Sequence, residues 1–243
     1  MKYVFGNWKM YLDFEESVIL AQALVEESFN KEKNEVAIFP STLAAREVIM
    51  CLNGSRIAAG AQDVAWVSKG AYTGAVSAHM FKSAGCKYAL VGHSERRYVF
   101  NESDDDVRKK IEACLDAGLI PVVCVGETQE DLNENKREYR LKKQLMKAFE
   151  GLQINGGKVM VAYEPVWAIG SGKPCGPDEA DSVHGWIKLE VKQYLGQDIP
   201  VLYGGSVNPE NVVSYAARDV IDGVLVGGAS TKLESFVKLI NYV

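Results

Sequence analysis

The sequence predicts an α/β protein that folds as a single (β/α)8 barrel. Short β-branched or aromatic segments recur eight times along the 243 residues, and longer segments with helical spacing separate them. No low-complexity linker divides the chain. Eight strand–helix units in roughly 250 residues is the usual size of such a barrel. We therefore expect residues 1–243 to form one domain.

The eight β-type segments are predicted to be parallel strands. Several of them are apolar on both faces, as expected when helices cover both sides of a sheet. An open, doubly wound sheet would usually carry a glycine fingerprint after its first strand, where this chain has "GNWKM". The barrel is therefore favoured. The predicted strands span residues 3–9, 35–39, 56–60, 88–92, 120–126, 158–163, 199–204 and 223–227.

Four of the intervening segments carry clear helix signals. Ser103 is a candidate N-cap and Gly118 a candidate C-terminal stop, and Pro177 and Gly196 bracket another helix in the same way. The longest segment predicts one continuous helix with a basic, solvated face at 134–143. The four segments are 13–28, 103–118, 128–151 and 176–196.

Composition narrows the functional classes. Apolar residues at 47% and charged residues at 24% are ordinary for a globular protein. A net charge of −5 without a basic block argues against a nucleic-acid partner. Five cysteines without a CxxC pair predict reduced thiols, and three histidines without ligand spacing predict no metal site. We find neither a signal peptide nor an apolar run of about 18 residues, so we expect a cytoplasmic protein without membrane contact.

Three predicted strands end in reactive side chains. In barrels of this class the active site lies at the C-terminal ends of the strands. Asn7 and Lys9 end the first strand, two residues apart and therefore on one face. His93 and Glu95 follow the fourth strand, and Glu164 ends the sixth. Taken singly, each would more often be structural, but a cation, an imidazole and a carboxylate at one end together predict proton-transfer chemistry.

Glycine-rich segments follow the last three strands. These are "AIGSGK" (168–173), "YGGSV" (203–207) and "VGGAS" (226–230). Glycine lets backbone N–H groups approach an anion closely, and a helix after the third segment would add its positive N-terminal end. Together the segments predict a phosphate cradle, while the lack of a P-loop lysine argues against a nucleoside triphosphate.

At these residues the chain resembles the triosephosphate isomerase family. "GNWKM", "VGHSERR", "AYEPVWAIGSGK", "YGGSV" and "DGVLVGGAS" match the motifs of that family in order and spacing, over essentially the whole chain. The resemblance implies a TIM barrel that interconverts dihydroxyacetone phosphate and glyceraldehyde 3-phosphate. It also implies that no cofactor and no metal take part.

The resemblance assigns a role to each reactive side chain. Glu164 would be the base that moves a proton between neighbouring carbons, and neutral His93 would polarise the carbonyl. Lys9 would supply fixed positive charge, with Glu95 as its partner, and Asn7 would position the oxygens. The groups implied to hold the phosphate are the amides of Gly170, Gly227 and Gly228, together with Ser206.

The resemblance also implies a lid over the glutamate. Expelling water makes a carboxylate more basic, and binding the non-reacting phosphate would drive the closure. The far hinge departs from the family because it contains Pro174, which predicts altered lid kinetics rather than lost activity. The implied near hinge is Pro165, Val166 and Trp167, the tip runs from Ala168 through Ile169 to Gly172, and Leu225 completes an apolar clamp.

The segment 62–78 is long for a barrel loop, and long loops in compact domains are usually functional. The resemblance implies a homodimer in which this loop inserts into a twofold partner, with Gln62 and Thr73 reaching towards the partner's catalytic region. The family usually has a glutamate where this chain has Ala75, so an arginine such as Arg96 loses an intersubunit partner. We expect a weaker dimer or a compensating residue.

Two other classes of function are open on the same residues. Another phosphate-sugar isomerase or an aldolase-like lyase would share the glycine loops. Such an aldolase needs a Schiff-base lysine deep on a strand, whereas Lys9 accompanies an imidazole and a carboxylate, which suits proton transfer. A barrel retained as a scaffold would tolerate loss of a catalytic group, yet every expected group is present.

Overall fold

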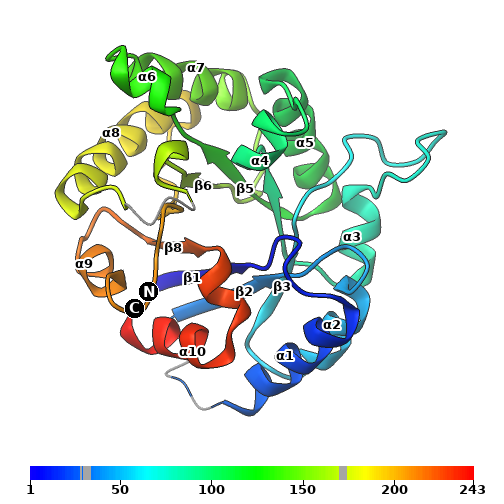
Figure 1. Ribbon diagram of the computed structural model, residues 1–243. Coiled ribbons are helices and arrows are strands. Elements are labelled where there is room, and N and C mark those ends of the chain that lie inside the picture. Colours follow the sequence, from blue (N-terminus) through cyan, green and yellow to red (C-terminus); the bar gives the residue numbers. More distant parts are fainter. Residues whose placement is uncertain (28, 30–33, 170–173) are drawn as a thin grey trace.

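The computed structural model describes residues 1–27, 29, 34–169 and 174–243. Within these residues, eight parallel strands pair in sequence order and close into a barrel (Figure 1). The predicted fold class and all eight predicted strands are confirmed, with strand ends shifted by at most two residues. The strands are β1 (Lys2–Asn7), β2 (Asn34–Phe39), β3 (Ala58–Ala61), β4 (Tyr88–Val91), β5 (Ile120–Val125), β6 (Met160–Tyr163), β7 (Val201–Tyr203) and β8 (Gly223–Val226).

The helices form a ring outside the strands (Figure 1). Two short 3-10 helices, η1 (Val166–Ala168) and η2 (Gly228–Thr231), lie directly after β6 and β8. The α-helices are α1 (Phe14–Glu26), α2 (Ala45–Cys51), α3 (Ala78–Ala84), α4 (Ser94–Tyr98), α5 (Asp104–Ala117), α6 (Gln129–Asn133), α7 (Arg137–Phe149), α8 (Pro177–Leu195), α9 (Val212–Ala216) and α10 (Leu233–Tyr242).

Alternation along the strands divides their side chains between two cores. In β6, Met160 and Ala162 pack inside the barrel, while Val161 and Tyr163 pack against the helices. Because successive strand residues point to opposite faces, the next residue, Glu164, belongs to the interior set. The alternation of apolar residues thus delivers a carboxylate to the mouth of the barrel.

Two predicted helices have the predicted ends. Ser103 caps α5 by accepting the N–H of Asp106, whose carboxylate accepts the N–H of Ser103 in return. Gly118 ends that helix with a φ of 74°, and Gly196 ends α8 with a φ of 67°. Pro177 occupies the first turn of α8, where its missing N–H costs nothing.

The prediction of one continuous helix over 128–151 is wrong. The segment forms α6 and α7, with a break after Asn133. Asn135 has a φ of 55°, and this left-handed conformation cannot continue a right-handed helix. The guanidinium of Arg140 on α7 donates to both carboxylate oxygens of Asp131 on α6, at 3.0 and 2.9 Å, which fixes the two helices together.

The predicted first strand also ends too late. β1 ends at Asn7, and Lys9 has a φ of 50°, so Lys9 is not a strand residue on the same face. Trp8 between them is buried, and its backbone N–H donates to Phe39 O at 3.1 Å. Lys9 therefore reaches the mouth of the barrel through a turn.

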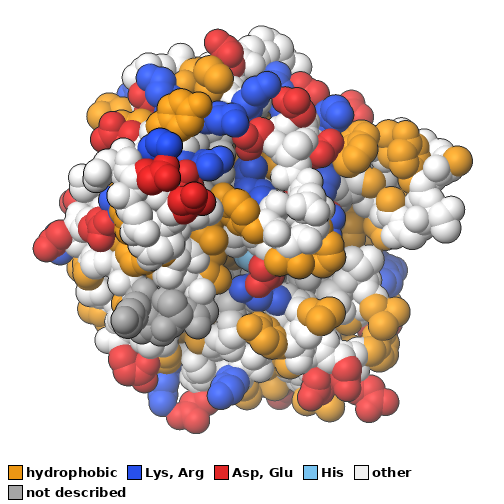
Figure 2. Space-filling model, turned by 45° about the horizontal axis from the view of Figure 1, so that its top comes forward, with side chains coloured by type: hydrophobic (Ala, Val, Ile, Leu, Met, Phe, Trp, Pro, Cys, Tyr) orange, Lys and Arg blue, Asp and Glu red, His pale blue; other side chains and the backbone are white. Residues whose placement is uncertain are grey.

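The loop between β3 and α3 projects from the barrel as a long arm (Figure 1). In the space-filling view this arm is a separate lobe that carries apolar side chains (Figure 2). Trp66 and Tyr72 on the loop are 42% and 50% exposed. Within the described residues, none of the helices combines the length and apolar character that crossing a bilayer would require.

Candidate active site

Glu164 is placed by two glycines on the neighbouring strand ends. Its backbone N–H donates to Val125 O at 2.8 Å, and its side chain is almost fully buried. A Cβ at Gly126 would lie 1.7 Å from the carbonyl oxygen of Glu164, and one at Gly204 would lie 2.8 Å from its Cγ. Any side chain at Gly126 would therefore displace the carboxylate-bearing backbone.

His93 reaches the barrel mouth because the chain turns at Gly92, whose φ is 72°. The ring Nδ1 accepts the N–H of Glu95 at 3.2 Å, so in the neutral ring the proton belongs to Nε2. Nε2 lies 3.3 Å from Oε1 of Glu164, and Oε2 of Glu164 accepts the N–H of Ser94 at 3.0 Å. The first turn of α4 thus orients both the imidazole and the carboxylate.

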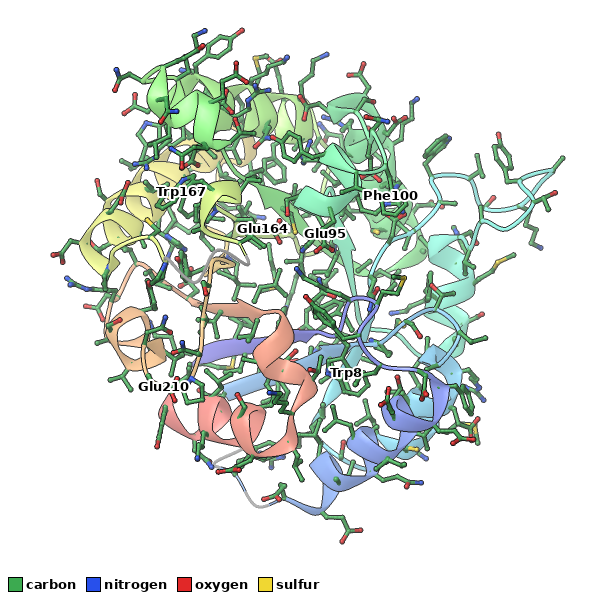
Figure 3. The ribbon with its side chains drawn as sticks, viewed as in Figure 1. Trp8, Glu95, Phe100, Glu164, Trp167 and Glu210 are labelled. Atoms are coloured by element: carbon green, nitrogen blue, oxygen red, sulfur yellow. The ribbon has the colours of Figure 1, made fainter. Side chains whose placement is uncertain are left out.

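Lys9 is held by Asn7 at the end of β1 and by Glu95 on a distant segment. Its N–H donates to Asn7 Oδ1 at 3.0 Å, and its Nζ donates to Glu95 Oε1 at 2.8 Å. The expected pairing of Lys9 with Glu95 is therefore observed. Figure 3 shows Glu95 and Glu164 near the centre of the barrel mouth. An ammonium group, an amide, an imidazole and a carboxylate converge there.

These groups line one cavity of about 330 Å³, within the size range of small-molecule sites. A hollow at the mouth is visible in Figure 2, with a histidine surface inside it. The structure brings most of the predicted site residues together on the wall of this cavity. They are Asn7, Lys9, His93, Glu164, Ile169, Ser206, Leu225, Gly227 and Gly228.

The predicted near hinge follows Glu164 directly. Pro165 is buried and precedes η1, and Val166 N–H donates to Glu127 O at 3.0 Å. The indole N–H of Trp167 donates to Glu127 Oε1 at 2.9 Å, and Figure 3 shows Trp167 on the side of α8. Two of the three hinge residues, Val166 and Trp167, are thus bonded to one glutamate.

The rest of the predicted lid is described only in part. Ala168 is buried and Ile169 is partly buried at the cavity wall. Gly170 and the rest of the predicted tip up to Gly172 lie outside the described residues, as does Lys173. Pro174 is exposed, while Cys175 beyond it is buried and its N–H donates to the Tyr203 hydroxyl at 3.1 Å.

Sequence reasoning missed Glu127, which is completely buried beside the hinge. Its Oε1 accepts from the Tyr163 hydroxyl and from Arg137 Nε, each at 3.0 Å. Burial and the nearby Glu127 hold the pKa of Tyr163 well above its usual range, so the phenol remains a donor. The signal was available, because Glu127 is a carboxylate two residues beyond the end of strand β5.

Two further contacts of Glu164 could not be predicted from the amino-acid types in the sequence. Ser94 acts through its backbone N–H, which every residue other than proline has. Cys124 lies inside the barrel, where burial and the Glu164 carboxylate raise the pKa of its thiol well above the usual value. The thiol is therefore protonated and inert beside the carboxylate.

Gln62 is expected to reach towards a partner subunit, and its side chain also has hydrogen-bond partners in its own chain. Its amide nitrogen donates to Lys9 O at 2.7 Å and to Phe39 O at 2.9 Å, both in its own chain. Gln62 directly follows β3, so its side chain spans the neighbouring ends of β2 and β1. Thr73 lies in the exposed part of the projecting loop.

Arg96 has charged partners within its own chain. It lies 3.3 Å from Asp63 Oδ2 and 3.4 Å from Glu102 Oε2. Lys110 also pairs with both carboxylates. Within the described part of the chain, no cluster of three or more His, Cys, Asp or Glu side chains is arranged to hold a metal ion.

Comparison with known proteins gives a consistent result. A sequence model of the triosephosphate isomerase family matches residues 2–243. A triosephosphate isomerase of Endomicrobium trichonymphae is 42% identical over 241 residues, covering 98% of this chain and 96% of the relative. A triosephosphate isomerase of Dictyoglomus thermophilum is 38% identical, and the match covers 98% of this chain and 98% of the relative. One of Alkaliphilus oremlandii is 40% identical, and the match covers 98% of this chain and 97% of the relative.

Proposed function

The chain belongs to the triosephosphate isomerase family, and on this basis we propose that it interconverts dihydroxyacetone phosphate and glyceraldehyde 3-phosphate. The reaction would be an intramolecular proton transfer without a metal or organic cofactor. The observation that carries this proposal is the 3.3 Å approach of His93 Nε2 to Glu164 Oε1 in a cavity that also contains Lys9.

Glu164 would act as the base. Its carboxylate would take a proton from the carbon next to the carbonyl and return it to the neighbouring carbon, which requires a negatively charged enediolate between the two steps. The buried position and the N–H of Ser94 hold the carboxylate in one orientation, so little reorganisation is needed at the moment of transfer.

His93 and Lys9 would stabilise the charge that forms on the substrate oxygens. The tautomer of His93 presents an N–H at Nε2 towards the cavity, which suits a developing oxyanion. The ammonium of Lys9 supplies fixed positive charge, and Asn7 beside it positions both the lysine backbone and the substrate oxygens.

The phosphate of the substrate would lie against the glycine loops after β7 and β8. Gly227 and Gly228 lead into η2, and with Ser206 they line the same cavity as Glu164. Backbone N–H groups at such a turn suit an anion. Gly170, which lies outside the described residues, would add a further amide in the closed enzyme.

The hinge would control access of water to the base. Pro165, Val166 and Trp167 would turn as the near hinge, carrying Ala168 and Ile169 over the substrate. Leu225 lines the same cavity as Ile169 and would complete the apolar clamp. Excluding water from the carboxylate increases its basicity, so closure would accelerate the proton transfer.

We also propose a homodimer. A second cavity of about 570 Å³ lies between the base of the projecting loop and the outer side of Lys9. Met10, Trp66 and Phe100 on its wall are 95%, 42% and 62% exposed, and exposed apolar side chains that gather around one hollow suit an interaction site. The loop tip of a second copy, including Thr73, would fill this cavity.

The remaining proposals concern organisation and location. Residues 1–243 would form one domain that binds neither nucleic acid nor membranes. The five cysteines are all free, which supports a reducing compartment and therefore the cytoplasm.

A coupled assay of glyceraldehyde 3-phosphate isomerisation tests the function, with Glu164→Gln as the control. We expect turnover by the wild type and a loss of at least about 1000-fold in the variant, because Gln cannot accept the carbon proton. A dilution series tests the dimer through the dependence of specific activity on protein concentration. An inactive wild type would contradict the assigned function.

A further inference from the structure

The backbone of Lys9 is in a conformation that it would not adopt by itself. Its φ of 50° is uncommon for residues with a side chain. The N–H is held by Asn7 Oδ1 at 3.0 Å and the carbonyl by Gln62 Nε2 at 2.7 Å. Both polar groups of the peptide backbone at this residue are therefore anchored by side chains.

The amide of Gln62 connects the ends of three consecutive strands. It follows β3, and its nitrogen donates to Phe39 O at the end of β2 and to Lys9 O just beyond β1. Both neighbouring atoms are carbonyl oxygens, which only accept hydrogen bonds, so the amide nitrogen must face them. Both N–H groups of this amide therefore donate hydrogen bonds.

The position of the Lys9 ammonium depends on this anchoring. Lys9 lines both the 330 Å³ cavity that contains Glu164 and the 570 Å³ cavity beside the projecting loop. Its ion pair is with Glu95, whose side chain is 46% exposed and lines the larger of the two cavities. A lysine that relaxed to a negative φ would direct its ammonium differently, because the Cα–Cβ direction follows the backbone.

We propose that Gln62 is a positioning residue for catalysis, because it holds the Lys9 backbone in the conformation that directs the ammonium to the substrate. This inference rests on the proposed function of Lys9. Gln62 itself does not contact the substrate. Losing its two hydrogen bonds leaves Lys9 free to leave the strained conformation, and the positive charge then misses the developing oxyanion.

The experiment replaces Gln62 by methionine, which has a similar length but neither donor nor charge. Gln62→Glu is the second variant, should Gln62→Met not fold. All enzymes are assayed at protein concentrations where specific activity no longer changes on dilution, so that subunit association does not contribute. We expect kcat/KM to fall about 10- to 100-fold, since a displacement of about 1 Å can cost that much.

Ser77 provides a matched control at the other end of the same loop. Its hydroxyl accepts the N–H of Met80 and caps α3, and neither residue contacts Lys9. Ser77→Ala should weaken the loop base but change kcat/KM less than twofold. An equal loss in Ser77→Ala and Gln62→Met would mean that Gln62 only supports the loop, and would overturn the proposal.

A double-mutant cycle with Lys9→Ala tests whether Gln62 acts through Lys9. When Lys9 is already replaced by alanine, Gln62→Met should lower kcat/KM less than twofold. The same loss with and without Lys9 would overturn the inference, as would a loss of less than twofold in the wild-type background. Wild-type turnover with an unaffected Gln62→Met would contradict only this inference, whereas an inactive wild type would contradict the proposed function.

Discussion

A buried histidine outside the active site makes a sharp prediction about pH. His184 on α8 is completely buried, and its Nδ1 lies 2.7 Å from Ala180 O one turn earlier. The ring packs edge-on against Tyr163 at 5.6 Å. Burial lowers the pKa of His184 from 6.5 to about 4, and the carbonyls of Ala180 and Leu202 offset part of that effect. Among nearby charges, Asp222 raises the pKa and Lys188 lowers it.

The sign follows from proton uptake. Between pH 6.5 and 4 the unfolded chain binds a proton at this histidine and the folded protein does not, so folding becomes less favourable as the pH falls. With pKa values of 6.5 and about 4, the free energy of unfolding decreases by about 2 kcal/mol between pH 7 and pH 5. The contribution is fully present above pH 6.5.

Urea unfolding at pH 7 and pH 5, at one protein concentration, measures this effect. His184→Gln keeps an N–H donor for Ala180 O but does not titrate. From pH 7 to pH 5 the free energy of unfolding of this variant should therefore decrease by about 2 kcal/mol less than that of the wild type. His79→Gln, at a position that is 45% exposed, serves as the control for removing a histidine. Equal decreases in the wild type and His184→Gln would refute the reasoning.

Two further predictions concern the active-site strand. Glu164→Asp withdraws the carboxylate by about 1.5 Å from Ser94 N and His93 Nε2. We expect kcat to fall at least about 100-fold, while the free energy of unfolding changes by about 1 kcal/mol. Near-wild-type turnover would rule out Glu164 as the base. Gly126→Ala should cost more than about 3 kcal/mol in urea unfolding, because its Cβ would meet the Glu164 carbonyl, whereas Gly185→Ala in α8 meets no atom within 4 Å and should be neutral or stabilising.

The fold was predictable because its signals are local and repeated. Each strand is a short apolar segment between turn residues, and Ser103, Gly118, Pro177 and Gly196 mark helix ends by their own conformational preferences. The break between α6 and α7 was missed because it depends on Asn135, whose left-handed conformation is one option among several for asparagine. The ion pair of Arg140 with Asp131 that fixes the break is a tertiary contact.

The geometry of the candidate site was predictable where side chains follow strands, and less so where backbone groups form the contacts. Glu164 continues the alternation of β6, so strand pattern alone places it. His93 and Lys9 are brought to the mouth by positive φ values at Gly92 and at Lys9 itself, which alternation does not predict. The N–H of Ser94 and the amide of Gln62 bind residues on distant segments, and only the closed barrel brings those segments together.

This division suggests how the barrel combines rigidity with chemistry. The proposed base, Glu164, directly follows strand β6, which pairs with β5 and β7 on its two sides. Gly126 and Gly204, which follow those two strands, pack closely against Glu164. The groups that would stabilise the substrate oxygens are carried by turns, and each turn is held by a side chain or an N–H from a neighbouring segment. Glu95 illustrates the consequence, because its backbone N–H fixes the tautomer of His93 while its carboxylate binds Lys9. Glu95 thus contacts both of the groups proposed to stabilise the substrate oxygens, so we expect the geometry of α4 to affect catalysis.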